Sequence, residues 1–318
     1  MQPGRDAELI EPAGRVGDLS LRDLAALLAD GHFALHTGSL VTRIRSALPD
    51  VARSIHALYA HHPYSVDPDF ADFHVRIGQP RNLRRWFRRQ AEFVIDGERP
   101  FEPLPRDQAP ALLEWGLNWS IAASCQQWLT IHAASLERNG GAVILPAPPG
   151  SGKSTLCAAL ALRGWRLLTD EMSLIDPRTI EAHALARPIN LKNASIDLIR
   201  AFAPDSVWGP ETYDTAKGRV THLRPPPASV ERMLEAAEPR WIVFPRYVAD
   251  AEPLLTPRGK ATTFIHFAQN SFNYSTLGSL GFAVAGNLVS QCDCYDFTYS
   301  RLEDALEVFD WLAEGGGR

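Results

Sequence analysis

The residue types best suited to chemistry lie in one short segment, residues 147–155, which reads Ala-Pro-Pro-Gly-Ser-Gly-Lys-Ser-Thr. It directly follows the apolar run 141–145, and a helical run begins at Ser154. A strand that ends in small and Gly residues presents backbone N–H groups that can turn toward an anion. The pattern therefore predicts a loop that binds the β- and γ-phosphates of a nucleotide, contacted by Pro149, Gly150, Ser151, Gly152, Lys153, Ser154 and Thr155.

Two side chains of this segment have specific expected roles. Lys153 would neutralise the terminal phosphates, and the Ser154 hydroxyl would ligate Mg²⁺, which prefers oxygen ligands. The consensus has Gly where this chain has Ala147, so the match departs at one position. The alternative is a plain strand-to-helix turn with a surface lysine. Against it, Gly150 and Gly152 cost backbone entropy unless something must approach the main chain closely.

A second set of chemical groups follows the predicted loop. Residues 164–171 form an expected strand that delivers two carboxylates, Asp170 and Glu171, at its end. We assign Asp170 as general base toward a substrate hydroxyl and Glu171 as support for the metal, with the order of these roles left open. His132 is a third catalytic candidate, and its alternative is a hydrogen-bonded core histidine. Three further residues are either cationic or polar contacts to the transferred phosphoryl or ordinary surface groups: Arg187, Asn190 and Lys192.

Composition narrows the classes of protein that the chain can be. It has 318 residues, 45% hydrophobic and 22% charged, with a net charge of −5 and a pI near 6.1. These values argue against a general binder of nucleic acid or membrane surfaces. The basic and aromatic residues at 81–89 could bind an acidic peptide or RNA. The favoured alternative is a solvent-exposed helix face whose aromatic side chains pack inward.

Localisation and compartment are also expected from the sequence. No run approaches about eighteen consecutive apolar residues, and residues 1–6 lack the apolar core of a signal peptide. The four cysteines are too few and too scattered for a disulfide framework. We therefore expect a cytoplasmic protein that does not enter a membrane.

Two domains are expected along the chain. Residues 1–120 would form a smaller N-terminal α+β lobe of unclear role, with a helix at 19–28 and strands at 70–77 and 91–98. A further helix is expected at 109–128, across the boundary. Residues 121–318 would form an α/β catalytic domain with a mixed sheet. Its expected parts are a hairpin of 129–136 with 141–145, strands at 164–171, 172–176 and 241–245, an exposed mobile loop at 208–227, and a final helix at 302–312.

The block from Ile131-His132-Ala133 through Gly152-Lys153-Ser154 to Asp170-Glu171 resembles the catalytic domain of HPr kinase/phosphorylase. It is more closely similar to HPr-kinase-related proteins of peptide-modification systems, including kinases that act on precursor peptides. The resemblance covers about residues 128–290. It implies a P-loop, HPr-kinase-like core, in which His132, Lys153, Ser154, Asp170 and Glu171 occupy the family's functional positions.

The chain departs from that family at several positions. The family has Asp-Asp where this chain has Asp170-Glu171, Gly where it has Ala147, and Glu where it has Thr155. The chain has no convincing copy of the Glu-x-Arg-Gly segment that the family uses to remove phosphate, so the reverse reaction is left out of the prediction. Residues 1–120 do not match the family's regulatory domain, so neither HPr as substrate nor a hexamer is carried over, and homo-oligomerisation stays open.

The leading functional prediction is an ATP- and Mg²⁺-dependent kinase that transfers the γ-phosphoryl to a Ser hydroxyl on a protein or peptide acceptor. An NTP-hydrolysing switch is one alternative, although the chain lacks the Asn-Lys-x-Asp motif of GTPases and the Leu-Ser-Gly-Gly-Gln segment of transporter ATPases. A nucleotide-binding scaffold with weakened catalysis is the other. Ala147 and Glu171 keep the scaffold in consideration.

Overall fold

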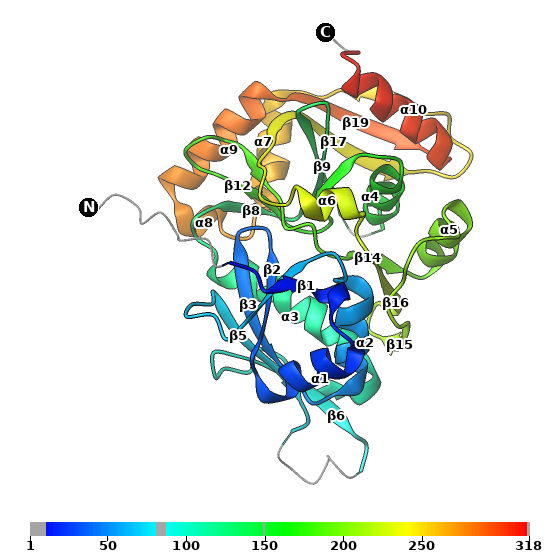
Figure 1. The fold of residues 1–318 in the computed structure, drawn as a ribbon. Coiled ribbons are helices and arrows are strands. Elements are labelled where there is room, and N and C mark those ends of the chain that lie inside the picture. Colours follow the sequence, from blue (N-terminus) through cyan, green and yellow to red (C-terminus); the bar gives the residue numbers. More distant parts are fainter. Residues whose placement is uncertain (1–10, 81–86, 149, 317–318) are drawn as a thin grey trace.

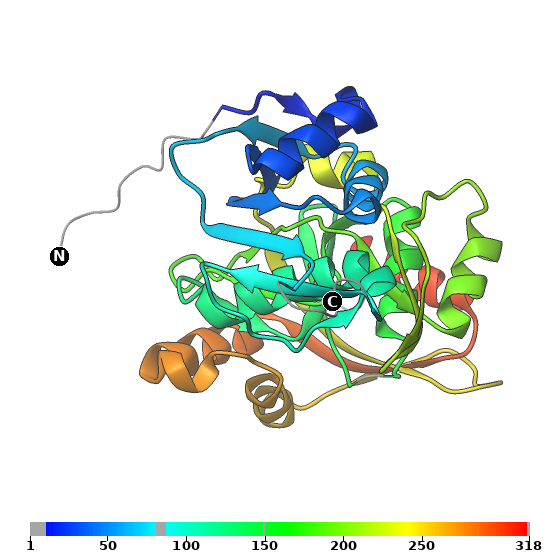
Figure 2. The ribbon, with the colours of Figure 1, turned by 90° about the horizontal axis from the view of Figure 1, so that it is seen from below.

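The structure is a computed structural model that describes residues 11–80, 87–148 and 150–316. Its first half is built on a seven-stranded sheet in the order β1-β4-β2-β3-β5-β6-β7, seen from below in Figure 2. The strands are β1 (Gly14–Arg15), β2 (Phe33–Thr37), β3 (Leu40–Arg45), β4 (Pro63–Val66), β5 (Phe73–Gly78), β6 (Gln90–Ile95) and β7 (Leu104–Pro105). The helices of this half are α1 (Leu21–Asp30), α2 (Pro49–Leu58) and α3 (Ala109–Ser124).

The second half is built on a six-stranded sheet in the order β11-β9-β10-β17-β19-β18. The strands are β9 (Ala133–Arg138), β10 (Gly141–Pro146), β11 (Arg166–Thr169), β17 (Glu238–Tyr247), β18 (Leu254–Pro257) and β19 (Asp293–Tyr299). The sheet is mixed, because β17 runs parallel to β10 and β19 whereas the other pairs are antiparallel. The expected α/β architecture with a mixed sheet is therefore confirmed.

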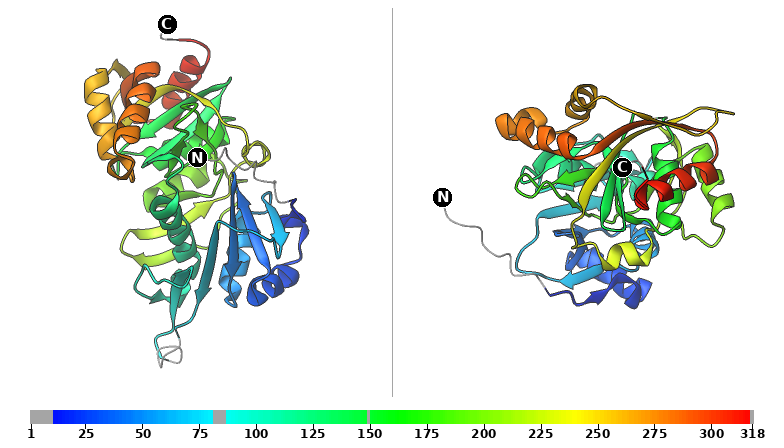
Figure 3. Two further views of the ribbon diagram at one scale, coloured as in Figure 1. Left: turned by 90° about the vertical axis from the view of Figure 1, so that its left-hand side faces the viewer. Right: turned by 90° about the horizontal axis from the view of Figure 1, so that it is seen from above.

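Helices cover both faces of this mixed sheet. Val143 and Leu145 pack on the face that carries α4 (Lys153–Leu162), α5 (Ala194–Phe202) and α10 (Leu302–Ala313). Ala142 and Ile144 point to the other face, which carries α7 (Lys260–Gln269), α8 (Tyr274–Leu277) and α9 (Ser279–Gln291). In Figure 3 the orange helices and the red helix α10 lie on opposite sides of the sheet. A strand buried on both faces explains the continuous apolar run before the loop.

Two small sheets are formed by β8, which precedes β9, and by strands that come between β11 and β17 along the chain (Figure 1). One has the order β13-β12-β8 and the other the order β14-β16-β15. Their strands are β8 (Leu129–Ile131), β12 (Ser173–Ile175), β13 (Ala182–His183), β14 (Ile189–Lys192), β15 (Thr212–Thr215) and β16 (Gly218–Leu223), and the short helix α6 (Pro227–Glu231) follows.

The structure corrects two sequence predictions. The segment 208–227 is not a loop, because β15 and β16 form a hairpin that pairs with β14. Its turn precedes Gly218, whose φ of 80° suits glycine, and Val220, Thr221 and Leu223 are fully buried. The stretch 129–136 is not one strand either, because β8 pairs with β12 and only β9 forms the hairpin with β10.

Two further predictions concern the basic cluster at 81–89 and the domain boundary near residue 120. Most of the basic cluster 81–89 lies outside the described residues. At Phe87, Arg88 and Arg89 the chain is not helical, and Phe87 is 78% exposed rather than docked inward. The predicted boundary near residue 120 falls inside α3, and the division into domains 1–120 and 121–318 stays a prediction.

Helix α3 lies unusually close to the first sheet at Gly116. A Cβ built there would stand 2.0 Å from Cε2 of Phe93 on β6, whereas one built at Gly286 on α9 would meet nothing within 4 Å. We expect Gly116→Ala to destabilise the protein by roughly 1–3 kcal/mol through overpacking. The control Gly286→Ala should stabilise it by roughly 0.5–1 kcal/mol through backbone entropy. Denaturant unfolding measures both, and equal effects would contradict this picture of α3 packing.

Candidate functional site

The loop between β10 and α4 is held in a conformation that requires glycine. Gly150 and Gly152 have φ values of 86° and 88°. A Cβ on Gly152 would stand 2.5 Å from the Tyr299 hydroxyl, which donates to the Gly152 carbonyl at 3.1 Å. The backbone N–H of Tyr247 donates to the Ser151 carbonyl at 2.9 Å. The loop is therefore braced by the ends of β17 and β19, while predicted contact Pro149 lies outside the described residues.

A cavity of about 860 Å³ lies over this loop. Its size is within the range of pockets that hold drug-sized ligands and cofactors. It brings together most of the predicted site: the described loop residues, Thr155, His132 and Glu171 line it, as do Asn190 and Lys192. Lys217, from the β15–β16 turn, also lines it. The sequence did not single out Lys217, because its segment was expected to be an exposed loop.

Lys153 is unusual because it is a buried lysine that lines this cavity. It is only 8% exposed, and its Nζ is buried without a hydrogen-bond partner. Buried ammonium groups are normally paired and hydrogen-bonded, because an isolated buried charge is costly. The carboxylates of Asp170 and Glu171 interact with it electrostatically, yet its three donors are unused. This geometry suits an anion in the cavity.

Asp170 is buried at the end of β11, where Oδ2 accepts the backbone N–H of Asn190 at 2.9 Å. Its Oδ1 has no hydrogen-bond partner. Burial raises the pKa of Asp170 to about 6, although the Lys153 ammonium opposes the rise. A carboxylate with this pKa is ionised at neutral pH and is a stronger base than an ordinary aspartate.

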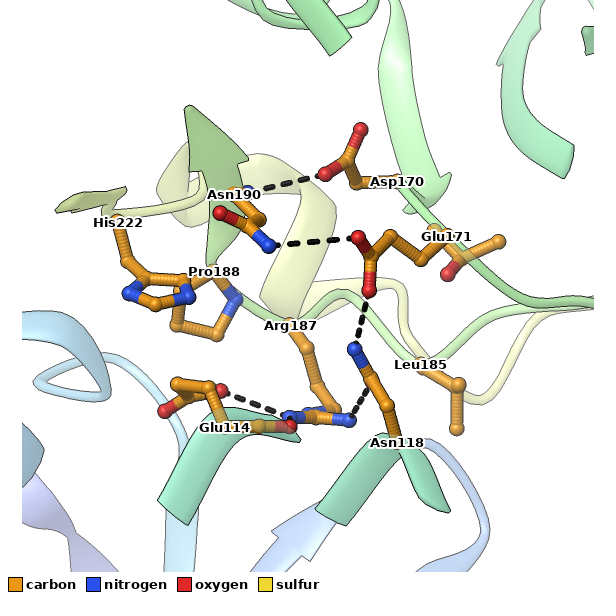
Figure 4. Close-up of a pocket in the computed structure, with 10 residues that line it drawn as sticks. Glu114, Asn118, Asp170, Glu171, Leu185, Arg187, Pro188, Asn190 and His222 are labelled. Carbon is orange, nitrogen blue, oxygen red and sulfur yellow. Dashed lines mark hydrogen bonds and ion pairs between the residues drawn. The ribbon is translucent and has the colours of Figure 1, made fainter. Parts of the chain in front are cut away.

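Glu171 points away from Asp170, toward α3 and β14 (Figure 4). Its Oε2 accepts the side-chain N–H of Asn118 at 2.5 Å, and its Oε1 accepts that of Asn190 at 3.3 Å. Burial alone would raise the pKa of Glu171, but the ammonium groups of Lys153, Lys192 and Lys217 together hold it below its ordinary value. Adjacent carboxylates with opposite pKa shifts are suited to different roles.

His132 lies between β8 and β9, where its backbone N–H donates to the Asn270 carbonyl at 2.7 Å. Its ring stands 5.9 Å from that of Phe272 and lines the large cavity. Burial, aided by the Lys153 ammonium, lowers the pKa of His132 to about 4. The ring is therefore neutral at pH 7, so it can accept or donate a hydrogen bond but adds no charge.

Arg187 does not reach the large cavity. It lines a separate space of about 20 Å³, together with Asp170 and Glu171, and its guanidinium bonds the buried Glu114 carboxylate at 2.7 Å. The prediction left open whether this residue contacts phosphate or is a surface charge, and the structure shows it as neither, because it is buried in an ion pair. Glu114 and Asn118 were missed in the sequence, although polar residues four positions apart in an apolar helix are a signal for a buried polar contact.

Metal ligands remain a prediction. Within the described ranges, no group of three or more His, Cys, Asp or Glu side chains is placed to hold a metal ion. Mg²⁺ usually takes only one or two protein carboxylates and completes its shell with phosphate oxygens and water. The predicted pair of Ser154 and Glu171 is compatible with this coordination, since both residues line the cavity.

Among the described residues, no helix has the length and apolar character needed to span a bilayer.

No protein-family model matches the chain, and no curated protein matches its sequence. Among solved structures, the chain is similar to the Hpr(Ser) kinase/phosphatase from Coxiella burnetii, with 14% identity and a TM-score of 0.26. The match covers 59% of this chain and 99% of that one.

The raised pKa of Asp170 makes stability depend on pH. The ordinary value for this carboxyl is 3.8 and the folded value is about 6, so the folded state binds the proton more tightly. The contribution of the Asp170 carboxyl to the free energy of unfolding is therefore fully present below about pH 4, and it is lost as the pH rises through about 6. We expect Asp170→Asn to be more stable than wild type at pH 7, with the gap closing toward pH 4. Thermal unfolding across that range measures it, and a gap independent of pH would contradict the burial of this charge.

Proposed function

We propose that this protein is an ATP- and Mg²⁺-dependent kinase that transfers the γ-phosphoryl to a Ser hydroxyl on a protein or peptide acceptor in the cytoplasm. The observation that carries the proposal is the buried, unpartnered Lys153 ammonium in a large cavity over a glycine-dependent loop. The acceptor class comes from the resemblance of residues 128–290 to HPr-kinase-related proteins.

The residues present fit a nucleoside triphosphate. Lys153 has three unused donors, and the glycine-dependent loop precedes the N-terminus of α4, where unpaired backbone N–H groups favour anions. The Ser154 hydroxyl and the Glu171 carboxylate would hold Mg²⁺, which neutralises charge on the β- and γ-phosphate oxygens. Lys192 and Lys217 also line the cavity and add positive charge there.

Asp170 would act as the general base. It would take the proton of the acceptor hydroxyl as that oxygen forms a bond to the γ-phosphorus, while the bond from the γ-phosphorus to the ADP oxygen breaks and ADP leaves. The pKa of about 6 gives a base that is free of its proton at pH 7. The backbone N–H of Asn190 holds one carboxylate oxygen, and the other, which is buried without a hydrogen-bond partner, would take the proton.

Nucleotide affinity tests the role of Lys153. We expect Lys153→Met to weaken binding of a fluorescent ATP analogue by roughly 10- to 100-fold, because a hydrogen bond to a charged group contributes about 1.5–3 kcal/mol. The matched control is Lys260→Met on α7, whose Nζ bonds the Cys292 carbonyl away from the cavity. Unchanged affinity in Lys153→Met, measured by fluorescence titration, would refute the nucleotide site.

Transfer of labelled γ-phosphate from Mg·ATP into a lysate of the source cells tests the reaction. We expect an acid-stable labelled band with wild type and with the control Asp176→Asn, whose side chain caps the turn after β12. Asp170→Asn should lower transfer roughly 10²- to 10⁴-fold while nucleotide affinity is kept. ATP turnover without any acceptor would favour a switch, and binding without turnover would favour a scaffold; either result would overturn the kinase.

A further inference from the structure

A chain of polar contacts runs from the first half of the protein to Glu171. Tyr59, at the end of α2, donates its hydroxyl to the Glu114 carboxylate of α3 at 2.8 Å. Glu114 accepts from Arg187 at 2.7 Å, and Arg187 also donates to the side-chain oxygen of Asn118 at 2.5 Å. The Asn118 amide nitrogen then donates to Glu171. Figure 4 shows the last three of these contacts around the small cavity.

The ion pair at the centre of this chain is buried. The Arg187 and Glu114 side chains are 7% and 3% exposed. Arg187 also donates to the Glu114 backbone carbonyl at 3.2 Å. Removing one partner of such a pair leaves an uncompensated buried charge, so its geometry is strongly enforced. Arg187 therefore presents a fixed donor to Asn118.

That donor decides which way the Asn118 amide faces. A guanidinium can only donate, so the amide oxygen must face Arg187 and the amide NH₂ must face Glu171. The NH₂ group offers a donor, which an ionised carboxylate accepts. Asn190 donates to the other oxygen of Glu171 at 3.3 Å, so the carboxylate is held from α3 on one side and from β14 on the other.

We propose that Asn118 is a positioning residue, which orients the Glu171 carboxylate for metal through its bonds to Arg187 and Glu171. The inference rests on the proposed function, because it takes Glu171 as a ligand of Mg²⁺. It gives residues 1–120 a role in the site, since Tyr59, Glu114 and Asn118 all come from that part of the chain. Partners that orient a metal ligand in this way typically change metal affinity 10- to 100-fold when removed.

The experiment measures Mn²⁺, as a spectroscopic probe for Mg²⁺, bound with a non-hydrolysable ATP analogue. The electron paramagnetic resonance signal of free Mn²⁺ gives the affinity without catalysis. We expect Asn118→Leu to weaken Mn²⁺ binding by about 10-fold or more, with metal-free binding of the analogue unchanged. If Asn118→Leu does not fold, Asn118→Ser replaces it with the same expected loss, because a serine is too short to bridge Arg187 and Glu171.

Two further variants separate the explanations. Ser120→Ala removes a buried bond from the Ser120 hydroxyl to the Gly116 carbonyl in the same helix and should leave Mn²⁺ affinity unchanged. An equal loss in Ser120→Ala and Asn118→Leu would mean a general effect of α3, which overturns the inference. Glu171→Gln should also weaken Mn²⁺ binding. If it does and Asn118→Leu does not, the inference fails while the proposed metal role stands; if Glu171→Gln has no effect, the metal role itself fails.

Discussion

Charge that is buried must be balanced within the protein or by what it binds, and the site is organised around this constraint. Glu114 and Arg187 balance each other in the interior, with Tyr59 and Asn118 satisfying their remaining donors and acceptors. Lys153 is also buried, but it lines the large cavity and its ammonium group has no hydrogen-bond partner. The contrast separates a structural ion pair from a cation that is ready for a ligand.

The same constraint explains how two neighbouring carboxylates differ. Asp170 is buried at the end of β11, and desolvation dominates its pKa. Glu171 faces the cavity, where three ammonium groups outweigh the desolvation. The backbone turn after β11 makes this possible, since it sends consecutive side chains to different neighbours.

Local patterns in the sequence predicted the parts of the fold that are local. The strand, glycine loop and helix at 141–162 are contiguous, and the structure confirms them at β10 and α4. The roles of Lys153, Asp170, Glu171 and His132 stay predictions, although the structure brings all four to one region. The hairpin at 212–223 was missed because Lys217-Gly218 and the following prolines look like a loop, whereas the pairing with β14 that stabilises it is non-local. Asn118 and Glu171 are 53 positions apart, and Glu114 and Arg187 are 73 apart, so no local pattern could pair them.

The bracing of the glycine loop has a consequence for the order in which ligands enter. The carbonyl oxygens of Ser151 and Gly152 already accept hydrogen bonds from Tyr247 on β17 and Tyr299 on β19. Among the described residues that line the cavity, Glu171 is the one carboxylate, against the ammonium groups of Lys153, Lys192 and Lys217. Under the proposed function, Mg²⁺ would therefore enter more favourably when it is already bound to the phosphate oxygens of the nucleotide than as a free ion, because the nucleotide offsets the positive charge of the lysines.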